Sequence, residues 1–422
     1  MPGLALGWGN VTKMEIRPLT ADDDLDAQRD LGERAFGAMP PAVRDGWLRR
    51  NALTVAAGRY LAVFDGSRQV GGAAFFDMRQ WWAGRELPMA GVASVKMAPE
   101  ARGQGTGRRL MTELLREIAE RGYPLSALYP ATMPIYRSLG WELAGGRYQA
   151  TIPTRSLRDL VPPDAAVPGR SLPVLRKATV ADAAGVISVL GRAHQDARDC
   201  GPVTRDLASV EDWLAHGEEY RYLGDDAFLA YEWQRGNTGL FAGWLAAASP
   251  EGTRALWSLL AAHSSTADTV EVRTSPDNPV WLLLRERDAR LVKLSKWMLR
   301  VVDAKAAIAG RGFPDGVSLA VRLTIIDDCL PRNSGRWDLV IDGGQGRLER
   351  AATGSTAPGS TAPGSGSGTG TLTLGARGLA ALYGGTPVAT LRLAGLAAGG
   401  SPAGDAALSA AFSGLAFMLD DF

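Results

Sequence analysis

Hydrophobic and polar positions predict a strand that runs directly into a helix near residue 100. The segment "AGVASVKM" has the content of a strand, and the residues after the turn place Leu110, Leu114, Leu115 and Ile118 on one helical face. Gly122 ends that helix. The turn lies within "VKMAPEARGQGTGRRLM", which contains three glycines and three arginines. The pattern therefore predicts an open, positively charged turn where a strand becomes a helix.

The same strand–turn–helix pattern occurs again in the middle of the chain. "IRPLTAD" at 16–22 and "LRKATVAD" at 175–182 both predict a short strand entering a helix capped by Thr20 or Thr179. Further on, "LFAGWLAAASPEGTRALWSLLAA" repeats the strand and the helix, but its turn is only "SPEG". We therefore predict two copies of one domain type, of which the second keeps the fold and has lost the site.

A third region begins near residue 312. "RWDLVIDGGQGRLER" alternates and turns at Asp342-Gly343-Gly344, which predicts a hairpin. "GSTAPGSTAPGSGSGTG" has too little apolar content to order itself, and only about 50 residues follow it, so we interpret it as an inserted loop. The predicted organisation is a flexible extension over 1–13 and domains over 14–156, 157–312 and 313–422, the last with a flexible insertion over 352–370.

Length and composition narrow the class of protein. A chain of 422 residues predicts two or three domains, and a net charge of +1 argues against a nucleic-acid-binding surface over the whole molecule. The two cysteines, Cys200 and Cys329, cannot form a disulfide framework or a metal cluster, which favours a reducing cytoplasm. No segment approaches the roughly 18 apolar residues of a membrane span, and the first residues do not read as a signal peptide.

The glycine–arginine turn has the chemistry of an anion site. Free N–H groups and the helix dipole at a helix N-terminus attract anions, Gly105 and Gly107 allow close backbone approach, and Arg102 and Arg108 add charged donors. A pyrophosphate is the natural ligand. The turn is neither a P-loop, because no Gly-Lys-Ser/Thr follows, nor a dinucleotide fingerprint, because the spacing differs. The alternative is that this glycine-rich turn binds no ligand.

These residues resemble a known family. Arg102-x-x-Gly105-x-Gly107 after a V-x-M-x-P strand resembles the acetyl-CoA signature of the Gcn5-related N-acetyltransferases, and "PIYRSLGWE" is similar to their second motif. "GYPLSALYPATMPIY", "WMLRVVDAKAAIAGRGF" and the terminal "DDF" resemble the enhanced intracellular survival (Eis) aminoglycoside acetyltransferases. The resemblance covers nearly the whole chain from Met14. It implies an α+β fold with two acetyltransferase domains, the first intact and the second degenerate, before a sterol carrier protein-like domain.

The resemblance also implies a set of site residues. Acetyl-CoA would bind at the turn, with its pantetheine arm paired to the strand backbone; the residues concerned are Val95, Met97, Arg102, Gly103, Gln104, Gly105, Thr106, Gly107 and Arg108. Tyr136 would be the general acid, since a phenol stays protonated at neutral pH. The family's base is its C-terminal carboxylate, which maps to Phe422. The alternative for Tyr136 is a packing tyrosine. We expect the three histidines, which lie outside any motif, to be surface or core residues rather than catalysts.

The acceptor is less well defined by the sequence. Asp420 and Asp421 would favour a polycationic substrate, and Trp47, Trp297 and the Trp81–Trp82 pair are candidate pocket walls. An acidic pocket residue of the family falls near Ala38, so the substrate preference stays open. The leading hypothesis is an N-acetyltransferase for aminoglycoside amines, at one or more positions, assembled as a homo-hexamer as the family implies. The alternatives are acetylation of protein lysine or polyamines and, in another class, a lipid-binding or scaffold protein.

Overall fold

A computed structural model describes residues 14–160, 172–234, 236–352 and 370–422. The extension predicted over 1–13 and nearly all of the insertion predicted over 352–370 lie outside these ranges. The chain divides into two compact units. The first comprises residues 1–76 and 91–121, and the second comprises residues 77–90 and 122–422. Within the described ranges, no helix is both long enough and apolar enough to cross a membrane.

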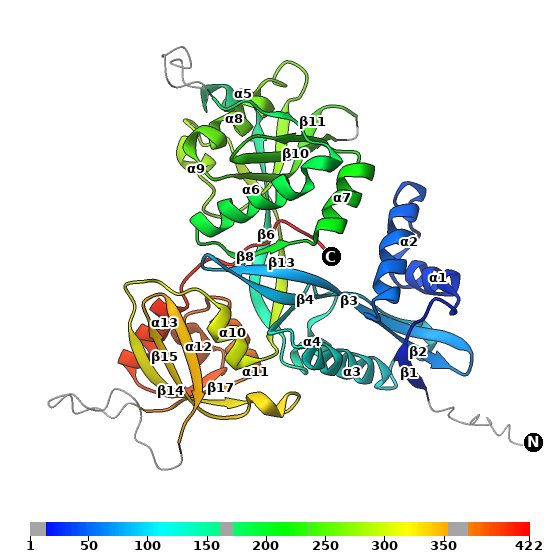
Figure 1. Ribbon diagram of the computed structural model, residues 1–422, viewed down its shortest axis with the longest axis vertical. Coiled ribbons are helices and arrows are strands. Elements are labelled where there is room, and N and C mark those ends of the chain that lie inside the picture. Colours follow the sequence, from blue (N-terminus) through cyan, green and yellow to red (C-terminus); the bar gives the residue numbers. More distant parts are fainter. Residues whose placement is uncertain (1–13, 161–171, 235, 353–369) are drawn as a thin grey trace, which may run out of the picture. The chain divides into compact units, whose positions relative to one another are not determined.

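The first unit is a small antiparallel sheet with helices (Figure 1). Strand β2 pairs with β1 on one side and with the first part of β3 on the other. The elements are β1 Glu15–Pro18, α1 Leu25–Phe36, α2 Pro41–Ala56, β2 Tyr60–Asp65, β3 Arg68–Trp82, β4 Arg85–Met97 and α3 Thr106–Glu120. Strands β3 and β4 pass through both units.

Helix α3 is the helix predicted from the hydrophobic pattern. Leu110, Leu114, Leu115 and Ile118 are all buried, as their spacing requires. The N-cap of α1 is different from the predicted one. Asp24 caps this helix by accepting from the amides of residues 26 and 27. Thr20 instead bonds Asp23 in the preceding turn, because the chain needs one more turn before the helix begins.

The second unit contains a long sheet that joins the two acetyltransferase-like copies. Its strand order is β5-β13-β6-β12-β11-β10-β9-β7. Strand β13, the last strand of the central copy, pairs antiparallel with β5 and with β6 and thus separates two strands of the first copy. These strands are β5 Leu125–Leu128, β6 Glu142–Pro153, β7 Arg176–Lys177, β9 Tyr220–Leu223, β10 Ala227–Trp233, β11 Gly239–Ala247, β12 Thr269–Thr274 and β13 Arg290–Val301.

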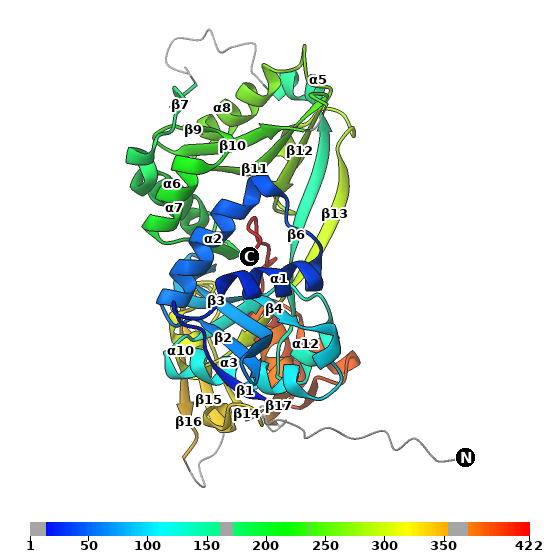
Figure 2. The ribbon, with the colours of Figure 1, turned by 90° about the vertical axis from the view of Figure 1, so that its right-hand side faces the viewer.

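Helices cover both faces of the central copy's sheet (Figure 2). Strand β10 alternates, so Phe228 and Ala230 pack against α6 and α7, whereas Leu229 and Tyr231 pack against α8. Strand β8 Cys200–Thr204 leaves this sheet and pairs with the end of β3. The helices of this unit up to β13 are α4 Met133–Arg137, α5 Thr154–Leu157, α6 Ala183–Asp196, α7 Leu207–His216, α8 Pro250–Ala261 and α9 Val280–Leu283.

The last region is a separate sheet with order β16-β15-β14-β17-β18. The predicted hairpin is confirmed, because β15 and β16 pair antiparallel across Gly343-Gly344. Helices α11, α12 and α13 lie beside this sheet in Figure 1. The elements are α10 Ala304–Gly310, β14 Leu319–Ile326, β15 Gly335–Asp342, β16 Gln345–Arg350, β17 Leu372–Gly375, α11 Ala376–Tyr383, α12 Val388–Leu393, β18 Ala397–Gly399 and α13 Pro402–Ala411.

Candidate active site

The junction of β4 and α3 is open at the backbone. Gly103 and Gly105 have φ angles of 80° and 76°, which glycine adopts without strain, and a Cβ at either position would meet nothing within 4 Å. Gly105 is the N-cap of α3, and no side chain caps this end of the helix. The first amides of the 15-residue helix α3 are therefore available to an anion, together with the positive end of its dipole.

The charged residues of the turn surround this helix end. Arg102, Gln104 and Arg108 are exposed, and Nε of Arg102 donates to the carbonyl of Met97 at 3.2 Å. This bond leaves the terminal nitrogens of Arg102 free to reach a ligand. Thr106 is buried, so it contributes its backbone rather than its hydroxyl. Uncapped amides, glycines with open surroundings and two exposed guanidinium groups fit the pyrophosphate of acetyl-CoA.

Strand β4 carries the backbone predicted to pair with the pantetheine arm. Ser94 has a φ of 54°, unusual for a residue other than glycine, so the strand is bent just before Val95. Val95 and Met97 are half-buried, and the Met97 carbonyl already accepts from Arg102. The pairing of the pantetheine arm with Val95 and Met97 stays a prediction.

Lys96, between these two residues, is a buried cation that the sequence analysis missed. Its Nζ donates to the Gln28 carbonyl at 3.1 Å and lies 5.7 Å from the centroid of the Trp47 ring and 5.8 Å from that of Tyr60. Burial lowers the pKa of Lys96 to about 8. Trp47 is half-buried, and its predicted contact with substrate stays a prediction.

Tyr136 belongs to the second unit and lies on the short helix α4. Its side chain is 5% exposed, and its ring makes an edge contact with Trp141. Burial raises the pKa of the Tyr136 phenol to about 12, so the group is protonated at neutral pH. Among the described residues, its hydroxyl has no hydrogen-bond partner. A buried, protonated and unengaged phenol can donate a proton to a reacting group, although the same burial would suit a packing residue.

The C-terminal segment is built into the second unit rather than left free. Ala416 and Phe417 form parallel bridges with Cys200 and Gly146, so the segment runs between β8 and β6. The amide of Phe417 donates to Cys200 at 2.9 Å, and the amide of Met418 donates to Gly146 at 3.1 Å. These backbone bonds hold the end of the chain in a fixed place on the sheet.

The segment "LSAAFSGLAFMLDDF" is too apolar for a loose tail, which predicts that Phe412, Leu415, Phe417 and Leu419 dock. Burial follows this prediction at three of the four positions. Phe412, Phe417 and Leu419 are buried, as expected of residues that dock the terminus. Leu415 was expected to dock as well, but its side chain is 54% exposed. The reason is the turn at Gly414, where φ is 145°, because the chain enters the sheet only at the residue after Leu415.

Arginines neutralise the acidic residues near the terminus. Asp420 is buried and accepts from Arg205 at 2.7 Å; burial raises the pKa of Asp420, and Arg205 opposes that rise. Asp421 contacts Arg147 at 2.8 Å and Arg273 at 3.3 Å. Burial would raise the pKa of Asp421, but the two arginines hold it below its usual range. These carboxylates therefore present less negative charge to a substrate than the sequence indicates.

A pocket of about 400 Å³ lies beside the last residue. Tyr129 makes an edge contact with the Phe422 ring, and its hydroxyl donates to the Asp420 carbonyl at 2.8 Å. The pocket is lined by Tyr129, Pro130, Arg147, Ser295, Lys296, Asp421 and Phe422. No sequence pattern pointed to Arg147, Arg205 and Arg273. They come together only because β6, β8 and β12, which are far apart in the chain, meet at the C-terminal segment.

Two predicted pocket walls belong to the core instead. Trp297 is fully buried, with its ring 6.3 Å from that of Trp82, and Trp82 lies in turn against Tyr383. A side chain in this position cannot contact a substrate. The histidines are also structural: His194 bonds Asp199, and His263 bonds Tyr231.

The chain matches known families in three places. Residues 15–144 and 201–301 each match an acetyltransferase (GNAT) domain, and residues 304–418 match a sterol carrier protein domain. The sterol carrier match begins at residue 304, earlier than the boundary expected near 313.

Relatives of known structure or name cover most of the chain. A GCN5-related N-acetyltransferase from Kribbella flavida is 38% identical and has a TM-score of 0.86, with 97% of this chain and 98% of that one covered. N-acetyltransferase Eis of Mycobacterium tuberculosis is 28% identical over 67% of this chain and 71% of its own. Eis1 from Mycobacterium abscessus, at 22% identity and a TM-score of 0.73, shares the fold over 97% of this chain and 100% of its own.

Proposed function

Because this chain belongs to the GCN5-related N-acetyltransferase family and is similar to N-acetyltransferase Eis, we propose that it transfers the acetyl group of acetyl-CoA directly to amines of aminoglycosides, at one or more positions. The observation that carries the proposal is the open helix end at Gly105, with its uncapped amides and exposed Arg102 and Arg108. Such a site binds the phosphates of the co-substrate and fixes the thioester relative to strand β4.

The chemical step needs one proton donor and one acceptor. The acceptor amine must be neutral to attack the thioester carbon, so its proton passes to a base, directly or through water. A C–N bond forms, the C–S bond breaks, and the thiolate takes a proton. We assign the donor to Tyr136, whose pKa near 12 keeps it protonated, and the base to the carboxylate of Phe422, which the docked tail holds in place.

The charges around Phe422 favour a second candidate acceptor. Arg147 and Lys296 line the pocket, and the side chains of Asp420 and Asp421 are engaged by arginines. A polycation gains little attraction from such a site. A single amine on a larger neutral or acidic molecule, such as a lysine side chain of a protein, suits it better. Acetylation of protein lysine is therefore the alternative that this observation favours.

Thiol release from acetyl-CoA tests both candidates. The enzyme would be offered aminoglycosides, a lysine peptide and a linear polyamine at equal concentrations, with an N-acetylated form of each as the matched control. We expect release with aminoglycosides and none with the acetylated forms. Release with the lysine peptide alone would move the function to protein acetylation. Absence of release with every amine would favour the lipid-binding alternative.

The role of the terminus is tested by removing its charge. Amidation of the Phe422 carboxylate should lower kcat by about 10²–10⁴-fold, the usual contribution of a general base, without changing acetyl-CoA affinity. Phe422→Ala is the matched control, because it keeps a terminal carboxylate while removing the ring. An amidated enzyme with full activity would exclude the carboxylate and leave Asp420 or Asp421 as the base.

We also propose the hexamer that the Eis resemblance implies. Strand β13 carries a row of exposed apolar side chains, Leu291, Val292 and Leu294, which is unusual on a free surface and suits contact with another copy. Light scattering after size-exclusion chromatography would give the number of copies. A monomer at micromolar concentration would contradict the proposal.

A further inference from the structure

The turn after Tyr136 determines where the phenol points. Helix α4 is only five residues long, and it is closed by the amides of Leu139 and Trp141, which donate to the Tyr136 carbonyl at 3.0 and 3.1 Å. Gly140 has a φ of 93° in this turn. A Cβ there would lie 2.8 Å from Nε of Arg300 and 2.7 Å from the Ala376 side chain. So short a helix has little rigidity of its own, and its position depends on its neighbours.

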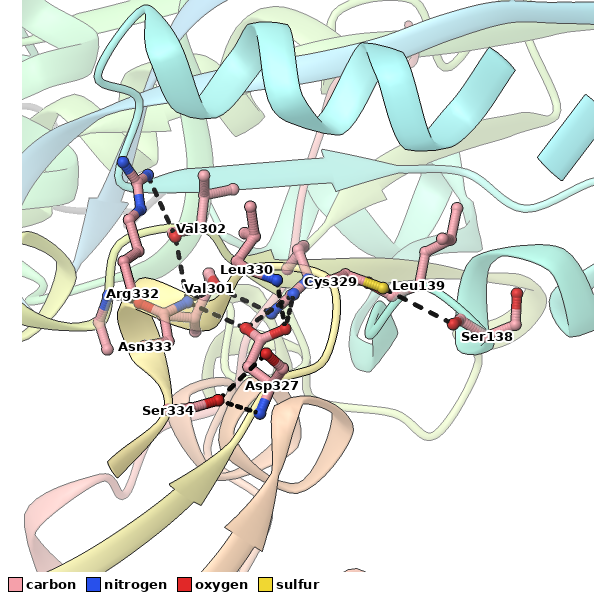
Figure 3. A network of polar contacts seen from close by, with 12 residues as sticks. Ser138, Leu139, Val301, Val302, Asp327, Cys329, Leu330, Arg332, Asn333 and Ser334 are labelled. Carbon is pink, nitrogen blue, oxygen red and sulfur yellow. Dashed lines mark hydrogen bonds and ion pairs between the residues drawn. The ribbon is translucent and has the colours of Figure 1, made fainter. Parts of the chain in front are cut away.

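A buried ion pair between Arg300 and Asp327 fixes one end of this turn. Figure 3 shows Asp327 with its neighbours Leu330, Asn333 and Ser334. Nε of Arg300, on β13, donates to the Leu139 carbonyl at 2.9 Å, and its NH2 donates to both oxygens of Asp327 at 2.6 and 2.8 Å. Asp327 also accepts from the Leu330 amide and from the Asn333 side chain, each at 3.0 Å. Asp327 follows β14, so this contact ties the turn to the sterol carrier protein domain.

A second ion cluster fixes the other side. Arg137, next to Tyr136 in the chain, donates to Glu142 at 2.8 Å, and Arg377 on α11 donates to the other Glu142 oxygen at 2.7 Å. Glu142 is 4% exposed and also accepts from the Leu143 amide. Burial would raise the pKa of Glu142, but these donors hold it below its usual range. The carboxylate therefore stays charged and bound at neutral pH.

Both clusters begin on the chain around Tyr136 and end in the last domain. Buried ion pairs seldom add net stability over apolar residues of the same volume, so their contribution here is better sought in geometry. We infer that the sterol carrier protein domain serves the acetyl transfer by positioning Tyr136, with Arg300–Asp327 and Glu142–Arg377 as its two points of attachment. The inference rests on the proposed role of Tyr136 as general acid. It gives the domain a role in catalysis that needs no ligand of its own.

Arg377→Met is the sharpest test, because its side chain is 38% exposed and its loss should not prevent folding. We expect kcat to fall about tenfold to hundredfold, as for a misplaced catalytic group, with the KM for acetyl-CoA unchanged. Arg377→Lys, which keeps the charge, should restore most of the rate. The matched control is Arg392→Met, which removes an ion pair with Asp405 of similar exposure in the same domain but far along the chain from α4. Equal kcat losses in Arg377→Met and Arg392→Met would overturn the inference.

A double-mutant cycle with Tyr136→Phe separates positioning from general support of the fold. If Arg377 acts through Tyr136, Arg377→Met should cause no further loss of kcat in the Tyr136→Phe background. Independent, multiplicative losses would overturn the inference and leave the acid assignment intact. An unchanged kcat in Tyr136→Phe alone would overturn the acid assignment and the inference with it. Arg300→Lys, which keeps a charge for Asp327 but loses the planar fork, should repeat the Arg377→Met result.

Discussion

The two acetyltransferase copies begin alike. In the first, Asp23 accepts from Thr20 and from Arg17, and in the second, Asp182 accepts from Thr179 and from Arg176 with nearly the same distances. The turn that brings the first strand to the first helix is thus kept in both copies. This turn lies outside the predicted site, and its hydrogen bonds belong to the fold that the two copies share.

The copies differ at the next helix. The N-terminus of α3 is uncapped and open, with Gly105 at the N-cap. The N-terminus of α8 is closed by Ser249, whose hydroxyl accepts from the Gly252 amide at 2.9 Å, and Glu251 places a negative charge in its first turn. A helix end can satisfy its amides with its own side chain or keep them for an anion. The second copy took the first course when it lost the site.

The same contrast appears one strand later. The first copy follows β5 with α4, which carries Tyr136, whereas the central copy follows β12 with α9, whose residues are Val280, Trp281, Leu282 and Leu283. No phenol stands in α9, and Leu282 is 91% exposed. The central copy therefore lacks both an uncapped helix end and a counterpart of Tyr136.

The largest effect should come from making the first copy like the second at α4. Tyr136→Phe should lower kcat by about 10²–10⁴-fold and leave acetyl-CoA affinity unchanged, because only proton transfer is lost. Steady-state kinetics and calorimetry measure the two quantities. Tyr220→Phe, in an exposed position of the central copy, is the matched control. If the kcat of Tyr136→Phe equals that of the parent enzyme, Tyr136 has only a packing role.

The next effect should come from closing the open helix end. Gly105→Asp places a carboxylate where Ser249 stands in the other copy, and Arg102→Ala removes a charged donor. Either change should weaken acetyl-CoA binding about ten- to a hundredfold, since a hydrogen bond to a charged group contributes roughly 1.5–3 kcal/mol. Calorimetric titration gives the Kd, and Arg109→Ala is the control for loss of charge. An unchanged affinity for acetyl-CoA in both variants would show that acetyl-CoA binds elsewhere than at this helix end.

A smaller effect should come from Lys96, the next-to-last residue of β4. The corresponding residue of β11 is a buried alanine, Ala246. The pKa of Lys96 falls from 10.5 to about 8 on burial, so the unfolded chain binds more protons above pH 8. The free energy of unfolding should therefore rise with pH between about 8 and 10.5 in the parent.

Lys96→Met should remove this slope and raise the free energy of unfolding at pH 7 by roughly 1–3 kcal/mol. Urea unfolding at several pH values measures the difference between variant and parent. Lys177→Met, an exposed lysine of the central copy, should leave the slope unchanged. The same slope in Lys96→Met and the parent would show that Lys96 does not titrate in this range.

The smallest effect, on the free energy of unfolding, should come from removing the N-cap of α8 in the central copy. Ser249→Ala removes the cap of α8 and should lower the free energy of unfolding by about 1 kcal/mol. It should not create an acetyl-CoA site, because the turn lacks the glycine–arginine cluster of the first copy and Glu251 keeps a negative charge in the first turn of α8. Denaturant unfolding and a calorimetric titration with acetyl-CoA check the two statements. A second binding event in this variant would show that capping alone separates the two copies.

The sequence predicted what depends on local pattern. The α3 helix, its glycine-rich N-terminus and the shortened turn of the second copy follow from spacing and from the φ angles that glycine permits. The docked C-terminal segment was also predictable, since Phe412, Phe417 and Leu419 are too apolar for a free tail. The residues of this motif predicted a bound pyrophosphate, and the family resemblance that they carry implied acetyl-CoA as the co-substrate.

The sequence could not predict what depends on pairing between distant segments. Trp297 was expected in a pocket and lies in the core, because only the register of β13 between β5 and β6 places it against Trp82. Arg300 and Asp327 are 27 residues apart with no motif around either. Which arginine neutralises Asp421 is likewise decided by strand order rather than by sequence spacing.

The position of β13 also makes the sheet of the first copy depend on the central copy. Strands β5 and β6 of the first copy are not neighbours in the sheet. Strand β13 lies between them and pairs with both, although it begins about 150 residues after β6 along the chain. Until β13 has been synthesised, the facing edges of β5 and β6 are free to pair with other chains. The pairing of β13 with these edges then closes a long loop. The first copy therefore needs a strand of the central copy to complete its sheet, and loss of β13 should leave the facing edges of β5 and β6 unpaired.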